Sequence, residues 1–216
     1  MYDLDEAIRQ RYSTRMFLSE PVPRSLVEES LALATRAPSN SNVQPWQAVF
    51  ATGAVRDRLV TALLAEAGTG SPKIPPLADA FAHKRFELGA QMFGAMGIVR
   101  DDAEGRRTAI LRNWEFFGAP LAGVVCMHRD LGLVDGVGVG MFLQTLLLAL
   151  TARGLGTCVQ VSIAGYPEIV REELDIPAEL AIVCGLAVGY PDPSAPINSL
   201  RTPRDSVDGH VTFIEH

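Results

Sequence analysis

Arginine and serine alternate near the start of the chain, at Arg9, Arg11, Ser13 and Arg15. In an extended segment alternate residues face one side, so Arg11, Ser13 and Arg15 present two cations and a hydroxyl to one ligand. The planar guanidinium donates paired hydrogen bonds to phosphate oxygens. The segment therefore indicates either a phosphate site or a solvated helix end with dispersed charges.

A second group of polar side chains follows at residues 39–44 and leads into Pro45 and Trp46. Amide side chains offer a donor and an acceptor together, which suits the polar edge of a heteroaromatic ring. The same composition also suits a turn that caps the preceding helix. Both interpretations stand for Ser39, Asn40, Ser41, Asn42 and Gln44.

Two further segments carry possible ligand groups. The glycine-rich stretch 154–165 lacks both GxGxxG and GxxxxGK[ST], which argues against Rossmann and P-loop nucleotide binding. Arg201 and Arg204 lie in the C-terminal tail, where they either bind a ligand or are solvated.

The sequence shows no acid–base or nucleophile motif. Gly-x-Ser-x-Gly is absent, and the four histidines share no motif with a nucleophile. Binding groups without such a motif suit an enzyme whose bound cofactor performs the chemistry.

The overall composition narrows the class of protein. The chain has 216 residues, of which 48% are hydrophobic and 20% charged, as in ordinary globular domains. This length predicts one domain or a tightly fused pair. The net charge is -6, so the chain lacks the broad positive potential that non-specific nucleic-acid binding needs. No nucleic-acid partner is therefore expected.

Three cysteines, Cys126, Cys158 and Cys184, lie among apolar residues without CxxC spacing or a neighbouring histidine. This pattern argues against a zinc site or a redox pair and favours buried thiols in a reducing compartment. The acidic N-terminus has no apolar signal region, so we expect a cytoplasmic protein without a metal.

The elements that position these groups follow from periodicity and from glycine and proline punctuation. Ser25 and Glu28 have the spacing of a capping box for the second helix. Residues 137–150 are apolar, but they are shorter than the roughly 20 residues of a membrane span, so a core or interface helix is expected. The sequence predicts helices over 3–11, 25–36, 55–67, 78–94, 139–153 and 167–174.

Strands are expected where short apolar runs lie between these helices. Residues 181–188 are continuously apolar, as in a strand covered on both faces. The other expected strands are 47–51, 121–127, 158–161 and 211–214, and the charged segment 101–107 is expected to be exposed. The combination predicts an α+β or α/β fold with helices packed on a central sheet.

Taken together and in this order, the segments resemble the nitroreductase family of FMN-dependent oxidoreductases over nearly the whole chain. Residues 11–15, RYSTR, are similar to its N-terminal RxSxR/K element. Residues 37–46, APSNSNVQPW, are similar to its Pro-Ser-x-x-Asn-x-Gln-Pro-Trp loop, which is the most specific piece. GLGT at 154–157, VCGLAVGYP at 183–191 and RTPR at 201–204 complete the resemblance.

The resemblance implies an α+β layered sandwich whose central mixed sheet is flanked by helices. It implies one FMN-binding domain over residues 1–216, with 68–112 as a variable lid over the substrate site. It also implies an intertwined homodimer with FMN at the subunit interface and a C-terminal extension that reaches the partner.

The resemblance also implies the cofactor-binding residues. Arg11, Ser13 and Arg204, with Arg201, hold the FMN phosphate, and Arg15 lies near the flavin N1/O2 edge. Ser39, Asn40 and Asn42 reach the flavin from the other subunit, and Asn113 is a further candidate contact. The stretch 160–165 lines the N5/O4 edge of the flavin. The complete set of implied cofactor-binding residues also includes Tyr12, Gln44, Gln160, Val161, Ser162, Ala164 and Gly165.

The activity implied is that of an FMN-dependent NAD(P)H oxidoreductase, with hydride transfer through flavin N5 and NADH or NADPH as the reductant. Its acceptors are nitroaromatics, quinones or similar electron-poor rings, and no catalytic protein residue is implied. Two alternatives remain. One is another flavin reaction of the family, namely dehalogenation, enone reduction or flavin breakdown, and the other is an FMN-binding protein without turnover.

Overall fold

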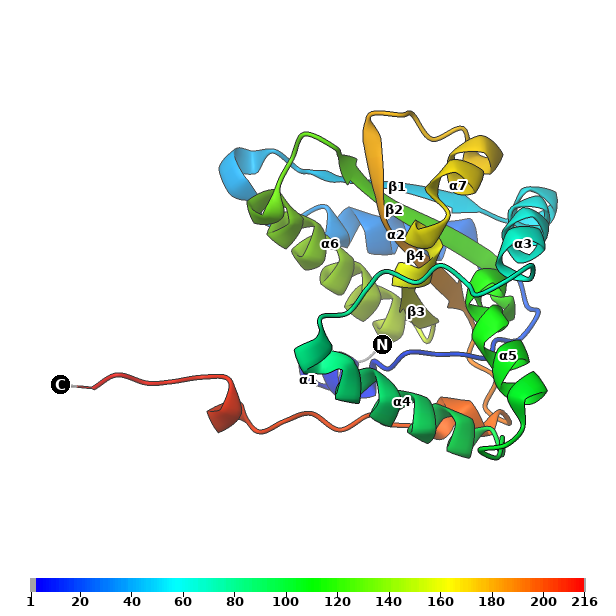
Figure 1. Ribbon diagram of the computed structural model, residues 1–216. Coiled ribbons are helices and arrows are strands. Elements are labelled where there is room, and N and C mark those ends of the chain that lie inside the picture. The colour runs from blue at the N-terminus through cyan, green and yellow to red at the C-terminus, as the bar shows by residue number, and fades with distance from the viewer. Residues whose placement is uncertain (1–2, 216) are drawn as a thin grey trace.

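A four-stranded sheet with helices on both faces forms the centre of the computed structural model, which describes residues 3–215 (Figure 1). The strands β1 (Trp46–Ala51), β2 (Leu121–His128), β3 (Gly156–Gln160) and β4 (Leu180–Gly189) lie in the order β1-β2-β4-β3. All three pairings are antiparallel. The four strands therefore form an antiparallel sheet rather than the expected mixed one, and within residues 3–215 parallel pairing is limited to an isolated bridge between Ser13 and Thr157 outside these strands.

The alternation of side chains along each strand divides the core into two layers. Ala122 and Val124 of β2 join the cluster formed with α3 (Gly53–Ala67) and α7 (Pro167–Leu174). Leu121 joins the opposite cluster with α2 (Arg24–Ala34) and α6 (Leu133–Ala152). The sheet is therefore buried on both faces, as the apolar run of β4 predicted.

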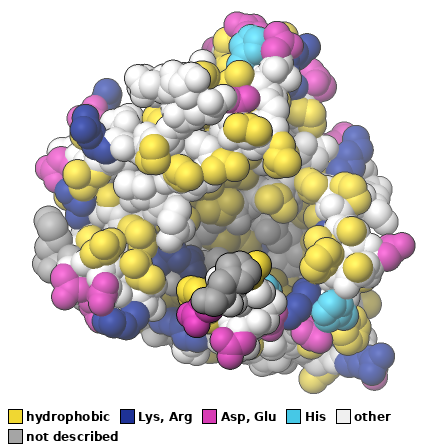
Figure 2. Space-filling view, turned by 90° about the vertical axis from the view of Figure 1, so that its left-hand side faces the viewer, with side chains coloured by type: hydrophobic (Ala, Val, Ile, Leu, Met, Phe, Trp, Pro, Cys, Tyr) yellow, Lys and Arg dark blue, Asp and Glu magenta, His cyan; other side chains and the backbone are white. Residues whose placement is uncertain are grey.

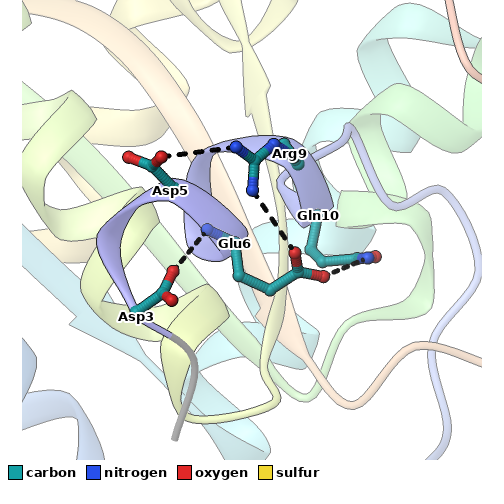
Figure 3. A network of polar contacts seen from close by, with 5 residues as sticks. All are labelled: Asp3, Asp5, Glu6, Arg9 and Gln10. Atoms are coloured by element: carbon teal, nitrogen blue, oxygen red, sulfur yellow. Dashed lines mark hydrogen bonds and ion pairs between the residues drawn. The ribbon is translucent and has the colours of Figure 1, made fainter.

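The first helix, α1 (Leu4–Gln10), is held together by its own side chains (Figure 3). The Asp3 carboxylate caps it by accepting a 2.8 Å hydrogen bond from the Glu6 backbone N–H. Arg9 pairs with Asp5 at 3.3 Å and with Glu6 at 3.8 Å. The expected helix over 3–11 is confirmed to within one residue at each end, and the charge of Arg9 is compensated inside it.

The expected cap of the second helix is wrong. Helix α2 begins at Arg24, one residue before Ser25, and Pro23 is its N-cap without a side-chain hydrogen bond. The fixed φ of proline already suits a helix start, so the helix begins there and Ser25 lies inside the first turn.

Helix α6 is longer than expected and begins at Leu133 rather than at Val139. The Asp135 carboxylate accepts a 3.0 Å hydrogen bond from the Gly132 backbone N–H and fixes the earlier start. Gly138 allows a loop to pack closely, because a Cβ there would lie 3.1 Å from Cβ of Ser39. The apolar segment is thus part of a 20-residue helix.

Within the described residues, α6 is also the one helix long and apolar enough to cross a membrane. Eight of its residues are buried, and Phe142, Leu146 and Leu150 pack in the core against α2. Leu133 and Val137 at its start remain exposed, at 90% and 53%. These features agree with the expected core or interface helix.

The segment between β1 and β2 adds two helices outside both core layers. Helix α4 (Ala82–Ala95) follows a 3-10 turn at Asp79–Phe81 and contains no buried residue. Helix α5 (Ala103–Leu111) buries only Ala109. Its charged start was expected to be exposed but not helical; Asp102 caps it by accepting a hydrogen bond from the Gly105 backbone N–H.

The expected strand at 211–214 is wrong. After the 3-10 turns Pro196–Ser199 and Val207–Gly209, the described tail forms no strand and extends away from the other elements (Figure 1). Phe213 and Ile214 are about four-fifths exposed, at 81% and 80%. A strand needs a neighbour for its hydrogen bonds, and no strand among residues 3–215 lies beside the tail.

All three cysteines are free and buried. Burial raises the pKa of Cys126 and of Cys158 to about 11, and that of Cys184 to about 12. The thiols are therefore protonated at neutral pH, which fits the expected role as apolar packing groups.

Candidate functional site

The two arginine-bearing segments of the sequence meet in one cavity of about 630 Å³, which we call the N-terminal cavity. It lies where the chain leaves α1, beside the C-terminal tail and the middle of α6. The structure therefore brings together side chains about 190 residues apart. Its lining comprises Ile8, Arg9, Arg11, Tyr12, Ser13, Arg15, Gln144, Leu200, Arg201, Thr202 and Arg204.

An extended backbone after α1 places these side chains, as the alternating pattern predicted. Arg11 is the C-cap of α1 and adopts φ -64° and ψ 120°. The backbone N–H of Thr14 then donates a 2.9 Å hydrogen bond to the carbonyl of Thr157 on β3. The segment is thereby fixed to the edge of the sheet.

Asn198 holds the tail against the same segment, and the sequence had not singled it out. Its Oδ1 accepts hydrogen bonds from the backbone N–H groups of Arg15, at 2.9 Å, and Met16, at 3.3 Å. Its Nδ2 donates to the carbonyl of Met16 at 2.8 Å. The residue is buried, so these bonds are protected from water, and they fix the tail that leads to Arg201 and Arg204. Gln144, which faces the cavity from α6, was likewise missed.

The N-terminal cavity carries uncompensated positive charge. Burial, and then the nearby Arg204, lower the pKa of Arg11. The Arg201 guanidinium lies 3.7 Å from the centre of the Tyr12 ring, which orients it without neutralising it. Across residues 3–215, only Arg9 among the five arginines of the cavity forms an ion pair, so the site is built for an anion.

Arg15 lies between this cavity and a smaller, mainly apolar one of about 290 Å³. Met92 of α4 and Met96, the residue that caps the C-terminus of this helix, line the smaller cavity together with Arg112. The Arg15 guanidinium donates a 3.2 Å hydrogen bond to the carbonyl of Ser13, and no ion pair joins it to Glu20 or to another described carboxylate. Its charge remains available to a ligand.

Strand β3 leads from the arginine segment to a second set of open polar groups. The amide nitrogen of Gln160 donates to the carbonyl of Asn113, whereas its Oε1 is buried without a partner in the described chain. Ser162 Oγ and Thr157 Oγ1 are also buried without a hydrogen-bond partner in the described chain. Leaving such a group unpaired costs about 1–3 kcal/mol, so a ligand that forms hydrogen bonds with these atoms would be stabilised.

The rest of the stretch 160–165 has other contacts. Val161 is 55% exposed, and Ala164 is half-buried in the 3-10 turn Val161–Gly165. A Cβ on Gly165 would lie 2.3 Å from the carbonyl oxygen of Lys73, so glycine there allows the segment before α4 to pack on the turn. The amide nitrogen of Asn113, a weaker candidate, donates to the carbonyl of Ile110.

The polar loop at 39–44 lies apart from the N-terminal cavity. Ser39 Oγ accepts a 3.0 Å hydrogen bond from the Gln44 backbone N–H and closes the loop. Asn42 and Gln44 adopt φ of 56° and 51°, and such left-handed conformations of residues other than glycine are concentrated at functional sites. Asn40, Asn42 and Gln44 are exposed, and none of the four predicted loop residues lines the cavity within one chain.

The arrangement can hold an anion firmly and can orient a polar ring, but it offers little acid–base chemistry. In the described part of the chain no three histidine, cysteine or carboxylate residues gather as a metal site would require. The polar side chains that line the cavity are permanently charged arginines, hydroxyls and an amide. Such a site suits chemistry that a bound group supplies.

Known proteins of similar sequence and structure complete these findings. The sequence profile described as Nitroreductase family matches residues 8–190. A 4-nitrobenzoate reductase of Nocardioides sp. (strain LMS-CY) is 37% identical over 220 residues, covering 97% of this chain and 89% of that protein.

Two solved structures share the whole fold. The FMN and NADPH-dependent nitroreductase NfnB from Sphigopyxis sp. strain HMH matches with a TM-score of 0.94 and 33% identity over all of both chains. The FMN-dependent nitroreductase NfnB from Mycobacterium smegmatis, in complex with NADPH, matches with a TM-score of 0.88 and 29% identity, covering 99% of this chain and 100% of that chain.

Proposed function

The chain belongs to the nitroreductase family and is an oxidoreductase of that family, and from this premise we propose that it uses FMN to reduce nitroaromatic compounds at the expense of NADPH or NADH. The observation that carries the proposal is the N-terminal cavity, in which four arginines without ion pairs face one space. A phosphate monoester is the part of FMN that such a cluster binds.

The residues present fit the cofactor. Arg11, Ser13, Arg201 and Arg204 supply donors for its phosphate, and Tyr12 fixes the direction of Arg201. The buried, unpaired Gln160 Oε1 and Ser162 Oγ lie farther along β3 and in the turn that follows, where they offer partners to the polar edge of the flavin ring. When bound, FMN supplies two-electron chemistry between the nicotinamide and an electron-poor acceptor.

The protein residues bind, orient and exclude water in this scheme. Arg15 places a positive charge between the phosphate site and the methionine-lined cavity, where it favours negative charge on a neighbouring ring. The polar loop at 39–44 completes the site from a second subunit, which explains why its amides lie outside the cavity of their own chain. Residues 68–112, which carry few buried side chains, act as the lid over the substrate.

The chemistry of the chain supports a cellular location. We place the protein in the cytoplasm because its three buried cysteines are unpaired, as in a reducing compartment. The acidic net charge and the packing of α6 against α2 support action without nucleic acid or membrane.

An anaerobic reduction assay tests the proposed function. NADPH or NADH is expected to bleach the flavin absorbance of the purified protein, and 4-nitrobenzoate is expected to restore it. A parallel panel of a quinone, an enone and a halogenated aromatic distinguishes the alternative flavin reactions. A bound flavin that neither nicotinamide reduces contradicts the proposal and favours a binding protein without turnover.

If the proposed function is correct, we expect the protein to be a homodimer. Figure 2 shows hydrophobic side chains gathered around a hollow on the face from which the C-terminal end projects, and the start of α6 is uncovered. Obligate interfaces bury such core-like surfaces. Light scattering of the FMN-loaded protein at micromolar concentration is expected to give twice the mass of one chain.

Charged substitutions locate that interface. Val137→Glu on the exposed side of α6 is expected to produce monomers, because a buried unpaired carboxylate is costly at an interface. Val55→Glu on α3, which covers the other face of the sheet, is the matched control. A wild-type monomer that retains FMN contradicts the dimer.

The charge of Arg15 gives the second expected outcome. Arg15→Gln is expected to retain FMN, since the phosphate contacts remain, but to lower its midpoint potential, because negative charge at N1 appears only on reduction. A difference of about 1.4 kcal/mol corresponds to about 30 mV for a two-electron couple. Spectroelectrochemical titration at one pH measures the shift, with Arg9→Gln as the control. An unchanged potential in flavin-replete Arg15→Gln refutes this role.

A further inference from the structure

A groove along α4 is left unused by the site described so far, and we call it the α4 groove. Its volume is about 550 Å³, within the range of small-molecule sites. Arg85, Phe86 and Phe93 of α4 line it, and Arg100 and Arg106 face it from the segment that leads into and begins α5.

The charge of the groove is uncompensated. None of its three arginines forms an ion pair with any residue between 3 and 215. Arg106 Nε is buried and lacks a hydrogen-bond partner in the same range. Arg85 makes one hydrogen bond, a 3.1 Å contact from its guanidinium to the carbonyl of Pro75. Three guanidiniums with spare donors favour an anionic ligand.

Aromatic surface accompanies this charge. Phe86 and Phe93 are seven residues apart on α4 and therefore share a face of the helix. The Arg106 guanidinium lies 5.2 Å from the centre of the Phe93 ring, whereas the Phe86 ring is 73% exposed. The exposed ring offers a stacking surface to a flat ligand.

The cations occupy two ends of the groove. Arg85 precedes Phe93 by eight residues, about 12 Å along the helix axis, and Arg106 lies over Phe93. The groove therefore suits a ligand with a flat ring and two separated anionic groups. An aromatic acceptor with a single carboxylate matches only one of these ends.

The α4 groove lies one helix away from the proposed flavin edge. Helix α4 presents Met92 to the cavity that Arg15 also lines, as does its C-cap residue Met96, and it presents Phe86 and Phe93 to the groove. A helix with its side chains is about 10–12 Å across, a span that a dinucleotide covers. A molecule with one end beside Arg15 can therefore place its other end on α4.

We propose that the α4 groove binds the adenosine half of NADPH, with the adenine on Phe86 and the phosphates on Arg85, Arg100 and Arg106. The inference rests on the proposed function in one respect, namely that a nicotinamide dinucleotide reduces the cofactor. The 2′-phosphate supplies the second anionic group that the two-ended groove matches, so the site prefers NADPH over NADH.

Calorimetric titration of the FMN-loaded protein with adenosine 2′,5′-bisphosphate tests the groove without turnover. The bisphosphate is expected to bind about tenfold or more tightly than adenosine 5′-monophosphate, because one more charge-assisted contact forms. Arg100→Gln and Arg106→Gln are each expected to weaken its binding by about tenfold. Arg24→Gln on α2 removes an equal charge outside the groove and is expected to bind as wild type does.

The outcomes separate this inference from the proposed function. Arg100 is exposed and makes no hydrogen bond among the described residues, so its variant remains informative even where Arg106→Gln fails to fold. Wild-type affinity in Arg100→Gln, or no binding of the bisphosphate, overturns the proposal. The proposal is also overturned if Arg100→Gln loses binding of 4-nitrobenzoate but keeps binding of the bisphosphate, because that result assigns the groove to the acceptor. Bisphosphate binding with a flavin that NADPH fails to reduce contradicts the proposed function alone.

Discussion

Replacing Arg204 by glutamine is expected to weaken FMN binding by about tenfold to a hundredfold, since a hydrogen bond to a charged group contributes about 1.5–3 kcal/mol. Arg204 lies close enough to Arg11 to lower the pKa of that guanidinium, so the two cations repel each other until an anion lies between them. Fluorescence titration of the apoprotein with FMN measures the change in dissociation constant.

Arg9→Gln is the matched control for this prediction. Arg9 lines the same cavity, but its guanidinium is paired with Asp5 and Glu6 inside α1 (Figure 3). Its removal therefore deletes an already compensated charge, and FMN affinity is expected to stay near the wild-type value. Equal affinities in the Arg9 and Arg204 variants contradict the phosphate assignment.

Replacing Trp114 by alanine is expected to lower the free energy of unfolding by about 3–5 kcal/mol, as large-to-small changes of buried aromatic residues do. Trp114 is fully buried in the 3-10 turn Arg112–Gly118 and packs edge-on against Tyr166, with ring centres 5.9 Å apart. Tyr166 in turn accepts a 3.0 Å hydrogen bond from the Lys73 backbone N–H. The cavity left by the indole is therefore also expected to loosen the start of the proposed lid, at Lys73.

Urea unfolding of the FMN-loaded protein, followed by circular dichroism at one protein concentration, measures this loss. Trp114→Phe is expected to restore most of the stability, because the indole Nε1 has no hydrogen-bond partner in the described chain to lose. Phe86→Ala, at a ring that is 73% exposed, is expected to cost no more than about 0.5 kcal/mol. A loss below about 1 kcal/mol for Trp114→Ala contradicts the core assignment.

The two regions that these variants probe have different mechanical roles. The proposed phosphate site is held by the sheet, through Thr14 and Thr157, and by the buried Asn198. The proposed lid at 68–112 carries few buried side chains, so its local unfolding requires little apolar exposure. Under the proposed function, a rigid anchor for the cofactor with a loosely packed cover would let acceptors of different shapes reach one ring.

Much of this architecture was predictable from local sequence. The alternation of Arg11, Ser13 and Arg15 predicted an extended segment with its cations on one side, and the structure has that segment. The apolar run at 181–188 predicted a strand covered on both faces, and β4 is such a strand. These features depend on periodicity over a few residues, which a sequence displays directly.

Local rules failed where neighbouring signals competed or where a partner was missing. Pro23 set the start of α2 before Ser25 could cap it. The β-prone residues 211–214 have no strand beside them in one chain and stay extended. Helix α5 was missed because its charged sequence shows no apolar face, and Asp102 is its main starting signal.

The candidate site likewise has features that the local sequence predicts and features that only the tertiary structure shows. The sequence by itself determined which side chains can bind an anion, because the chemistry of an arginine or an amide belongs to the residue. Only the tertiary structure decided that Arg11 and Arg204 face one cavity, that Asn198 clamps their two segments together, and that Arg106 joins the α4 groove. Contacts between residues so far apart depend on how the whole core closes, and no local pattern along the chain records that closure.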